Sequence, residues 1–183
     1  YQFGESEEIL ADLIAADRDH FVVGTKFSMG ADPQGGVSRT GNSRKNIVRS
    51  VEASLRRLRT DRIDVYWAHR ADGLTPVDEI VRALDDLVRA GTVLYVGLSD
   101  FPAWRAARAA TLAELRGWAP VTGLQVEYSL VERTAERELL PMAEALGMGV
   151  TLWSPLGGGL LTGKQRRGEQ GRHDAGGGPV RTE

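Results

Sequence analysis

Five short apolar runs alternate with longer amphipathic segments along most of this chain. The runs span residues 21–27, 63–69, 94–99, 123–128 and 148–153. Each run is short, rich in β-branched and aromatic residues and bounded by polar positions, which is the pattern of a buried strand. Successive runs start at intervals close to the roughly 30 residues of a strand–helix–strand unit. The sequence therefore predicts five strands.

The segments between these runs carry apolar residues at helical spacing. We expect helices at 6–16, 42–59, 76–91, 102–116 and 134–146. Thr75 and Pro76 are typical of a helix start, with a hydroxyl cap followed by proline at the first helical position. Pro141 falls inside the last expected helix and should kink it. Within 42–59, the pair Arg56 and Arg57 is interpreted most simply as solvated surface.

Strict alternation of strand and helix indicates a parallel sheet covered by helices. A doubly wound sheet and a (β/α)8 barrel both satisfy this pattern. No G-x-G-x-x-G motif follows any of the runs, which counts against a Rossmann dinucleotide fold. Residues 158–164 match the spacing of a phosphate loop, but Gln165 stands where Ser or Thr would hold magnesium and no apolar helix follows. We therefore reject a nucleoside triphosphatase.

Composition and charge limit the class of function. The 183 residues are 42% hydrophobic and 26% charged, which is typical of a globular protein. No apolar run approaches the roughly 18–20 residues of a membrane span, and a formal net charge of −2 gives no basic surface for nucleic acid. The three histidines are too scattered to indicate a metal site, and zero cysteines fit a reducing compartment. We expect no metal, membrane or nucleic acid as a partner.

The extent of the chain leads to two further expectations. It begins at Tyr1 rather than at methionine, so we expect it to be a piece of a longer protein. Beyond the last predicted strand the sequence becomes rich in Gly, Arg and Gln. We expect a single folded domain over 1–164 and an irregular or disordered tail over 165–183.

Each predicted strand changes from apolar to polar or aromatic residues at its carboxyl end. The residues at these ends include Lys26, His69, Ser99, Asp100, Gln125, Trp153 and Ser154. In parallel α/β proteins, whether barrels or open sheets, ligands bind at the carboxyl edge of the sheet. Five strands that all end in this way predict a ligand site at that edge.

Lys26 and His69 each have two interpretations. Lys26 is either an end-of-strand lysine that reaches water or a desolvated cation that tunes a neighbouring acid. A lone histidine at position 69 is more often a hydrogen-bonded core residue than a catalytic one. Their occurrence on neighbouring predicted strands favours the catalytic interpretation of both.

Six short segments follow one another in a characteristic order and spacing. They begin at Tyr1, Val23, His69, Tyr95, Gln125 and Trp153, with the sequences YQFGESEEIL, VGTK, HRAD, YVGLS, QVEYS and WSPLGGG. Together they resemble the aldo-keto reductase family, in particular its branch near bacterial reductases and potassium-channel beta subunits. The resemblance covers most of the chain, from Tyr1 to about Lys164.

The resemblance implies a (β/α)8 barrel, of which this chain would hold roughly the third to seventh strands, and hydride transfer from NADPH to an aldehyde or ketone. On the matching positions, Tyr1 is similar to the proton-donating tyrosine, Lys26 to its lysine partner and His69 to the histidine that orients the carbonyl. A phenol has an ordinary pKa near 10, so a buried ammonium beside it favours phenolate and helps to release the proton. A neutral imidazole that donates to the carbonyl oxygen stabilises the charge developing there.

The same resemblance implies a cofactor site. Ser99, Asp100 and Gln125 are similar to the nicotinamide carboxamide site, and Trp153 to the aromatic residue that stacks on the nicotinamide ring. The loop around the pyrophosphate would comprise Ser154, Pro155, Leu156, Gly158 and Lys164. Many family members have asparagine where Asp100 stands, and a carboxylate can only accept hydrogen bonds.

The function implied is NADPH-dependent reduction of a small carbonyl substrate by a cytoplasmic full-length protein. Two alternatives stay open: a non-catalytic NADPH-binding regulatory subunit that resembles the channel beta subunits, and an inactive fragment. Five strands of an eight-stranded barrel would leave unpaired edges at 21–27 and 148–153. We therefore also expect self-association through exposed sheet edges.

Overall fold

Five parallel strands form a single sheet in a computed structural model that describes residues 2–30, 36 and 39–163. The strands are β1 (Gly24–Phe27), β2 (Ile63–Ala68), β3 (Val93–Ser99), β4 (Val121–Glu127) and β5 (Gly149–Trp153). Their spatial order is β1-β2-β3-β4-β5, and every neighbouring pair is parallel. The prediction of an α/β fold with five parallel strands is confirmed.

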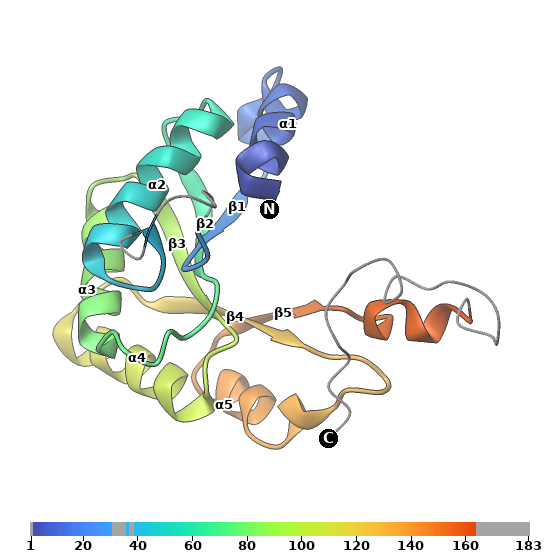
Figure 1. Cartoon of the computed structure of the whole chain (residues 1–183). Helices are drawn as coiled ribbons and strands as arrows, with labels where there is room; N and C mark the ends of the chain where they lie inside the picture. Colours follow the sequence, from blue (N-terminus) through green and yellow to red (C-terminus); the bar gives the residue numbers. More distant parts are fainter. Residues whose placement is uncertain (1, 31–35, 37–38, 164–183) are drawn as a thin grey trace.

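Helices connect the strands and cover the sheet. They are α1 (Glu5–Ile14), α2 (Arg44–Leu58), α3 (Val77–Arg89), α4 (Ala103–Arg116) and α5 (Leu139–Ala145). Consecutive helices contact one another, and Figure 1 shows α2, α3 and α4 following each other around the outside of the curved sheet. No helix in the described part of the chain is both long and apolar enough to cross a membrane.

The order of the strands distinguishes the two architectures that alternation left open. In a doubly wound sheet the strand order reverses at a switch point, where the helices change from one face to the other. Here the strands lie in sequence order with no reversal, so the chain winds in one direction throughout. The sheet is therefore a segment of a barrel.

Four local expectations were wrong. Residues 21–23 precede β1 and are not part of it. Thr75 does not cap α3, because Pro76 occupies the cap position and the Thr75 hydroxyl donates to Oδ2 of Asp72 at 2.6 Å. The helix expected at 134–146 is divided into a 3-10 turn, η4 (Thr134–Glu136), and α5. Pro141 lies in the first turn of α5, where a missing N–H is harmless, so it does not kink the helix.

The main core lies between the sheet and the helices. Tyr66 on β2, Leu98 on β3 and Leu124 on β4 are fully buried in it. They are covered by the apolar stripes of α2 and α3, which include Ile47 and Leu84. Burial of this apolar surface is the main force that holds the helices on the sheet.

On the other face of the sheet, one large side chain covers the backbone of two strands. Trp67 on β2 is in register with Gly97 on β3, which in turn pairs with Gly123 on β4. A Cβ atom at Gly97 would lie 2.4 Å from the Trp67 ring, and one at Gly123 would lie 2.7 Å from it. The indole therefore lies directly on the backbone of two neighbouring strands, and both positions require glycine.

We expect Gly97→Ala to lower the free energy of unfolding by about 1–3 kcal/mol, because the new methyl group overpacks the Trp67 ring. Gly149, the next residue of the same row on β5, is the matched control. A Cβ there would meet its nearest atom at an ordinary 3.6 Å, so Gly149→Ala should change stability by less than about 0.5 kcal/mol. Urea unfolding measures both, and an equal loss in the two variants would contradict this account.

The two edge strands of the sheet, β1 and β5, differ in length and in how exposed their side chains are. β1 is short, whereas all five residues of β5 are exposed, with the apolar side chains of Val150 and Leu152 38% and 48% accessible. An edge strand presents a row of unpaired backbone groups to any other strand that approaches it.

We propose that the 183-residue chain self-associates through β5, and we expect a dimer or larger assembly by size-exclusion chromatography with light scattering. Leu152→Lys should shift the chain toward monomer, because a charge on an edge strand opposes pairing. Leu115→Lys, at an exposed position of α4, is the control and should leave the assembly unchanged. A sharp monomeric peak for the unsubstituted chain would overturn the proposal.

Candidate functional site

The carboxyl ends of four neighbouring strands surround one cavity. His69 follows β2, Ser99 ends β3, Asp100 follows it, Gln125 lies on β4 and Trp153 ends β5. These five residues line a cavity of about 250 Å³. Ligands bind at this edge of the sheet in parallel α/β folds, so the structure brings the polar strand ends together where such a site belongs.

Lys26 lies on β1, in register with Trp67 and next to this cavity. It shares a second cavity of about 430 Å³ with His69, and Phe3 and Gly4 also line that cavity. Burial lowers the pKa of the Lys26 ammonium, and the Asp100 carboxylate opposes part of that shift. His69 therefore stands between the lysine and the strand ends of β3, β4 and β5.

The environment of His69 favours its neutral form. Burial, and after it the positive charge of Lys26, lowers the pKa of the imidazole, while Asp100 acts in the opposite direction. A histidine whose pKa lies below its usual value of about 6.5 is mostly uncharged at pH 7. Such an imidazole can donate one hydrogen bond to a bound ligand without carrying a charge.

A buried network holds the backbone around His69. The Ser28 hydroxyl donates to Oδ1 of Asn42, and Nδ2 of Asn42 donates to the carbonyl oxygen of Arg70 at 2.9 Å. The His69 N–H contacts Oγ of Ser28 at 3.1 Å, and Oδ2 of Asp72 accepts from the Asn42 N–H at 2.7 Å. Sequence reasoning missed the role of Ser28, which belongs to no motif, and that of Asn42, which marked only the start of a predicted helix. Asp72 was noted only as a member of the HRAD segment.

Asp100 connects two strands that are not neighbours. Its backbone is left-handed, with φ 50°, and its N–H donates to the Gln125 carbonyl oxygen at 3.1 Å. Its Oδ1 accepts a hydrogen bond from Nε1 of Trp153 at 3.1 Å. The carboxylate of Asp100 therefore spans β4 and fixes the edge of the Trp153 indole at the mouth of the cavity.

The remaining predicted residues lie beyond the cavity or outside the described part of the chain. Ser154, Pro155, Leu156 and Gly158 follow β5 and enter the 3-10 segment η5 (Gly157–Thr162). The Ser154 hydroxyl accepts the Gly158 N–H at 3.0 Å, which folds this loop back on itself. Tyr1, Lys164 and the tail expected at 165–183 lie outside the described residues. The roles of all these residues stay predictions.

The barrel segment and the polar cavity at its carboxyl edge define an α/β protein with a candidate site for a small molecule. A family model described as the aldo/keto reductase family matches residues 1–176. The chain belongs to this family, and the resemblance noted from its six segments is confirmed.

Named relatives cover nearly the whole chain. The uncharacterized oxidoreductase YrpG of Bacillus subtilis is 44% identical over 177 residues, which are 94% of this chain and 54% of that protein. An aryl-alcohol dehydrogenase [NADP(+)] of Phanerodontia chrysosporium is 36% identical over 88% of this chain and 44% of its own length. A putative voltage-gated potassium channel subunit beta of Schizosaccharomyces pombe is 36% identical over 92% of this chain and 50% of its own length. The chain spans about half the length of these relatives.

We expect Asp100→Asn to lower the pKa of His69 further. The Asp100 carboxylate stabilises the imidazolium form, so its removal favours the neutral imidazole, while asparagine keeps an oxygen for the Trp153 N–H. The imidazole resonances, titrated by NMR and assigned with His69→Gln, measure the shift. Glu114→Gln, an equal charge change at an exposed position of α4, is the control. A His69 pKa that is unchanged or raised in Asp100→Asn would contradict the assigned interaction.

Proposed function

We propose that the protein, as a cytoplasmic carbonyl reductase, transfers hydride from NADPH to a small aldehyde or ketone. Its family includes oxidoreductases of this general kind, and one named relative is an NADP(+) enzyme. The observation that carries the proposal is the cavity lined by His69, Ser99, Gln125 and Trp153, with Lys26 in the adjoining cavity.

The hydrogen-bonding groups of the cavity fit a carboxamide such as that of nicotinamide. Ser99 is 1% exposed, and its hydroxyl makes no side-chain hydrogen bond within the described part of the chain. Nε2 of Gln125 donates to Oγ1 of Thr151 at 3.1 Å, which leaves Oε1 of Gln125 to accept. A carboxamide offers one acceptor oxygen and one donor NH₂ group, the complement of this pair. When bound here, NADPH would supply the hydride.

The residues of the chain would supply the proton and the polarisation of the carbonyl. Tyr1 is the proposed acid, and Phe3, two residues after it, lines the same cavity as Lys26 and His69. The Lys26 ammonium would favour the phenolate form of Tyr1 and so ease loss of its proton. Neutral His69 would donate to the carbonyl oxygen and stabilise its negative charge in the transition state.

We expect Tyr1→Phe to lower the rate of carbonyl reduction by about 10²–10⁴-fold, the usual worth of general acid catalysis. NADPH affinity should be nearly unchanged, because the phenol acts on the developing alkoxide and not on the cofactor. Lys26→Met should be similarly severe, and Lys45→Met, an exposed lysine of α2, should have no effect. Steady-state rates on an aromatic aldehyde and a fluorescence titration with NADPH measure the two quantities. Wild-type turnover in Tyr1→Phe would show that Tyr1 is not the acid.

A non-catalytic NADPH-binding subunit is the second candidate, favoured by the relative named as a channel beta subunit. The same two measurements distinguish it from the enzyme. Saturable NADPH binding without turnover of any aldehyde or ketone favours the regulatory subunit. Absence of both binding and turnover favours an inactive fragment.

A further inference from the structure

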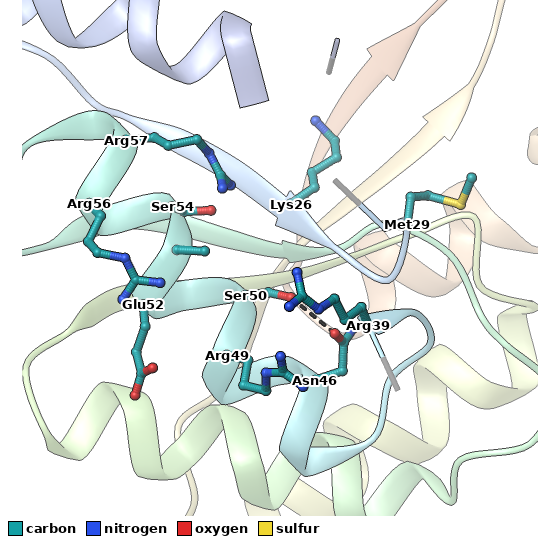
Figure 2. A pocket seen from close by; sticks show the side chains of 11 residues that line it. Lys26, Met29, Arg39, Asn46, Arg49, Ser50, Glu52, Ser54, Arg56 and Arg57 are labelled. Carbon is teal, nitrogen blue, oxygen red and sulfur yellow. Dashed lines mark hydrogen bonds between the residues drawn. The ribbon is translucent and has the colours of Figure 1, made fainter. Parts of the chain in front are cut away.

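A third cavity, of about 250 Å³, lies beside α2 at the end of β1 (Figure 2). Five cationic side chains line it: Lys26, Arg39, Arg49, Arg56 and Arg57. Among its described lining residues, Glu52 is the one with a carboxylate. Figure 2 shows that the Glu52 carboxylate is directed away from Ser50 and Arg39. We call this cavity the arginine pocket.

The positive charge of the arginine pocket is only partly balanced. Nε of Arg57 lies 2.6 Å from Oε2 of the buried Glu7, so this arginine is not the solvated surface residue expected from the sequence. Within the described residues, neither Arg49 nor Arg56 forms an ion pair. Charges of one sign gathered in a concave site raise the local concentration of the opposite ion.

A serine hydroxyl adds a neutral hydrogen-bond donor to the lining of the arginine pocket. Ser54 lines the arginine pocket and is 2% exposed. A serine inside a helix usually bonds back to the carbonyl one turn earlier. Ser54 makes no hydrogen bond within the described part of the chain, and in Figure 2 its hydroxyl points toward the side of the pocket on which Arg57 lies. Since no buried side-chain N or O atom in the described part of the chain lacks a partner, the Ser54 hydroxyl must be open to the pocket, where it can donate to an oxygen of a bound anion.

We propose that the arginine pocket binds the phosphate group of a small molecule. Guanidinium groups match the oxygens of phosphate in charge and geometry, and Ser54 adds a neutral donor. The volume falls just below the roughly 300–1,000 Å³ of pockets for drug-sized ligands, so it suits a small phosphorylated compound rather than a dinucleotide. The site is separate from the cavity between His69 and Trp153, with which it shares no lining residue.

The arginine pocket is nevertheless adjacent to the reaction site proposed above. It shares Lys26, Met29 and Arg57 with the cavity that contains His69. A phosphate there would favour the charged form of Lys26 and so raise its pKa. Two kinds of ligand would present the same phosphate group to the pocket: a phosphorylated carbonyl substrate, or a phosphate-bearing effector. The coupling to Lys26 rests on the proposed function, whereas the binding site itself does not.

Isothermal titration calorimetry of the native protein with inorganic phosphate, at low salt and without NADPH, tests the site. We expect saturable binding that Arg49→Gln weakens by about ten- to a hundredfold, the usual worth of a charge-assisted hydrogen bond. Ser54→Ala should weaken it a few-fold, and alanine is well tolerated in a helix. Arg108→Gln, an exposed arginine of α4, carries the same charge change and should bind phosphate like the unsubstituted protein.

Absence of saturable phosphate binding, or equal weakening by Arg49→Gln and Arg108→Gln, would overturn the proposal. So would competition between phosphate and NADPH, since the pocket would then belong to the cofactor. If a phosphorylated aldehyde has a lower KM than its unphosphorylated analogue, and Arg49→Gln abolishes the difference, the ligand is the substrate. If phosphate instead changes kcat on an unphosphorylated aldehyde, it is an effector. Both results support the site, and failure of NADPH binding alone bears on the proposed function only.

Discussion

The indole of Trp67 lies on the bare backbone of Gly97 and Gly123, and the candidate site is built one layer above this contact. Side chains two residues apart on a strand lie on the same face. His69, Ser99 and Gln125 each stand two residues beyond Trp67, Gly97 and Gly123 respectively, so the packed layer places all three at one height. A larger residue at either glycine would overlap the Trp67 ring, so we expect the strands to shift and these groups to move apart. The geometry of the site therefore depends on the packing of Trp67 against the two glycines.

Electrostatic coupling joins the parts that this layer aligns. Lys26, His69 and Asp100 come from the ends of three different strands, yet Asp100 raises the pKa of both Lys26 and His69, and Lys26 lowers that of His69. Desolvation and the lysine disfavour the imidazolium form of His69, and Asp100 moderates both effects. Asp100 also accepts a hydrogen bond from Trp153. The residue that raises the pKa values of Lys26 and His69 therefore also positions the indole that lines the cavity. An asparagine at position 100 would keep the hydrogen bond and lose the electrostatic tuning.

The sequence predicted the strands and their polar ends because both depend on local patterns: apolar runs, and a change of residue type where each run stops. The alternation of strands and helices did not distinguish a barrel from a doubly wound sheet, since strand order depends on pairing between segments distant in sequence. The barrel was predicted only from the resemblance of the six segments to a known family, and the strand order agrees with it. Nor did the sequence predict the hydrogen bonds from His69 to Ser28 and from Ser28 to Asn42. These bonds join residues that are distant in sequence, and no local pattern marks them. The break before α5 was missed because the helix was expected to begin at Thr134, which would place Pro141 in its interior. The helix begins at Leu139 instead, so Pro141 lies in its first turn, where proline is harmless.

The packing of α2 against the sheet determines where its arginine side chains lie. Its apolar residues Ile47 and Val51 are buried against the sheet, so the helix cannot rotate without exposing them. Fixing that face also fixes Arg49, Ser54 and Arg57 on the side that meets the end of β1. Arg57 is held further by Glu7, which also accepts a hydrogen bond from Thr25, the neighbour of Lys26. An anion bound to the arginines of α2 would therefore contact residues that are already hydrogen-bonded to β1 through Glu7 and Thr25. Through this strand it would influence Lys26.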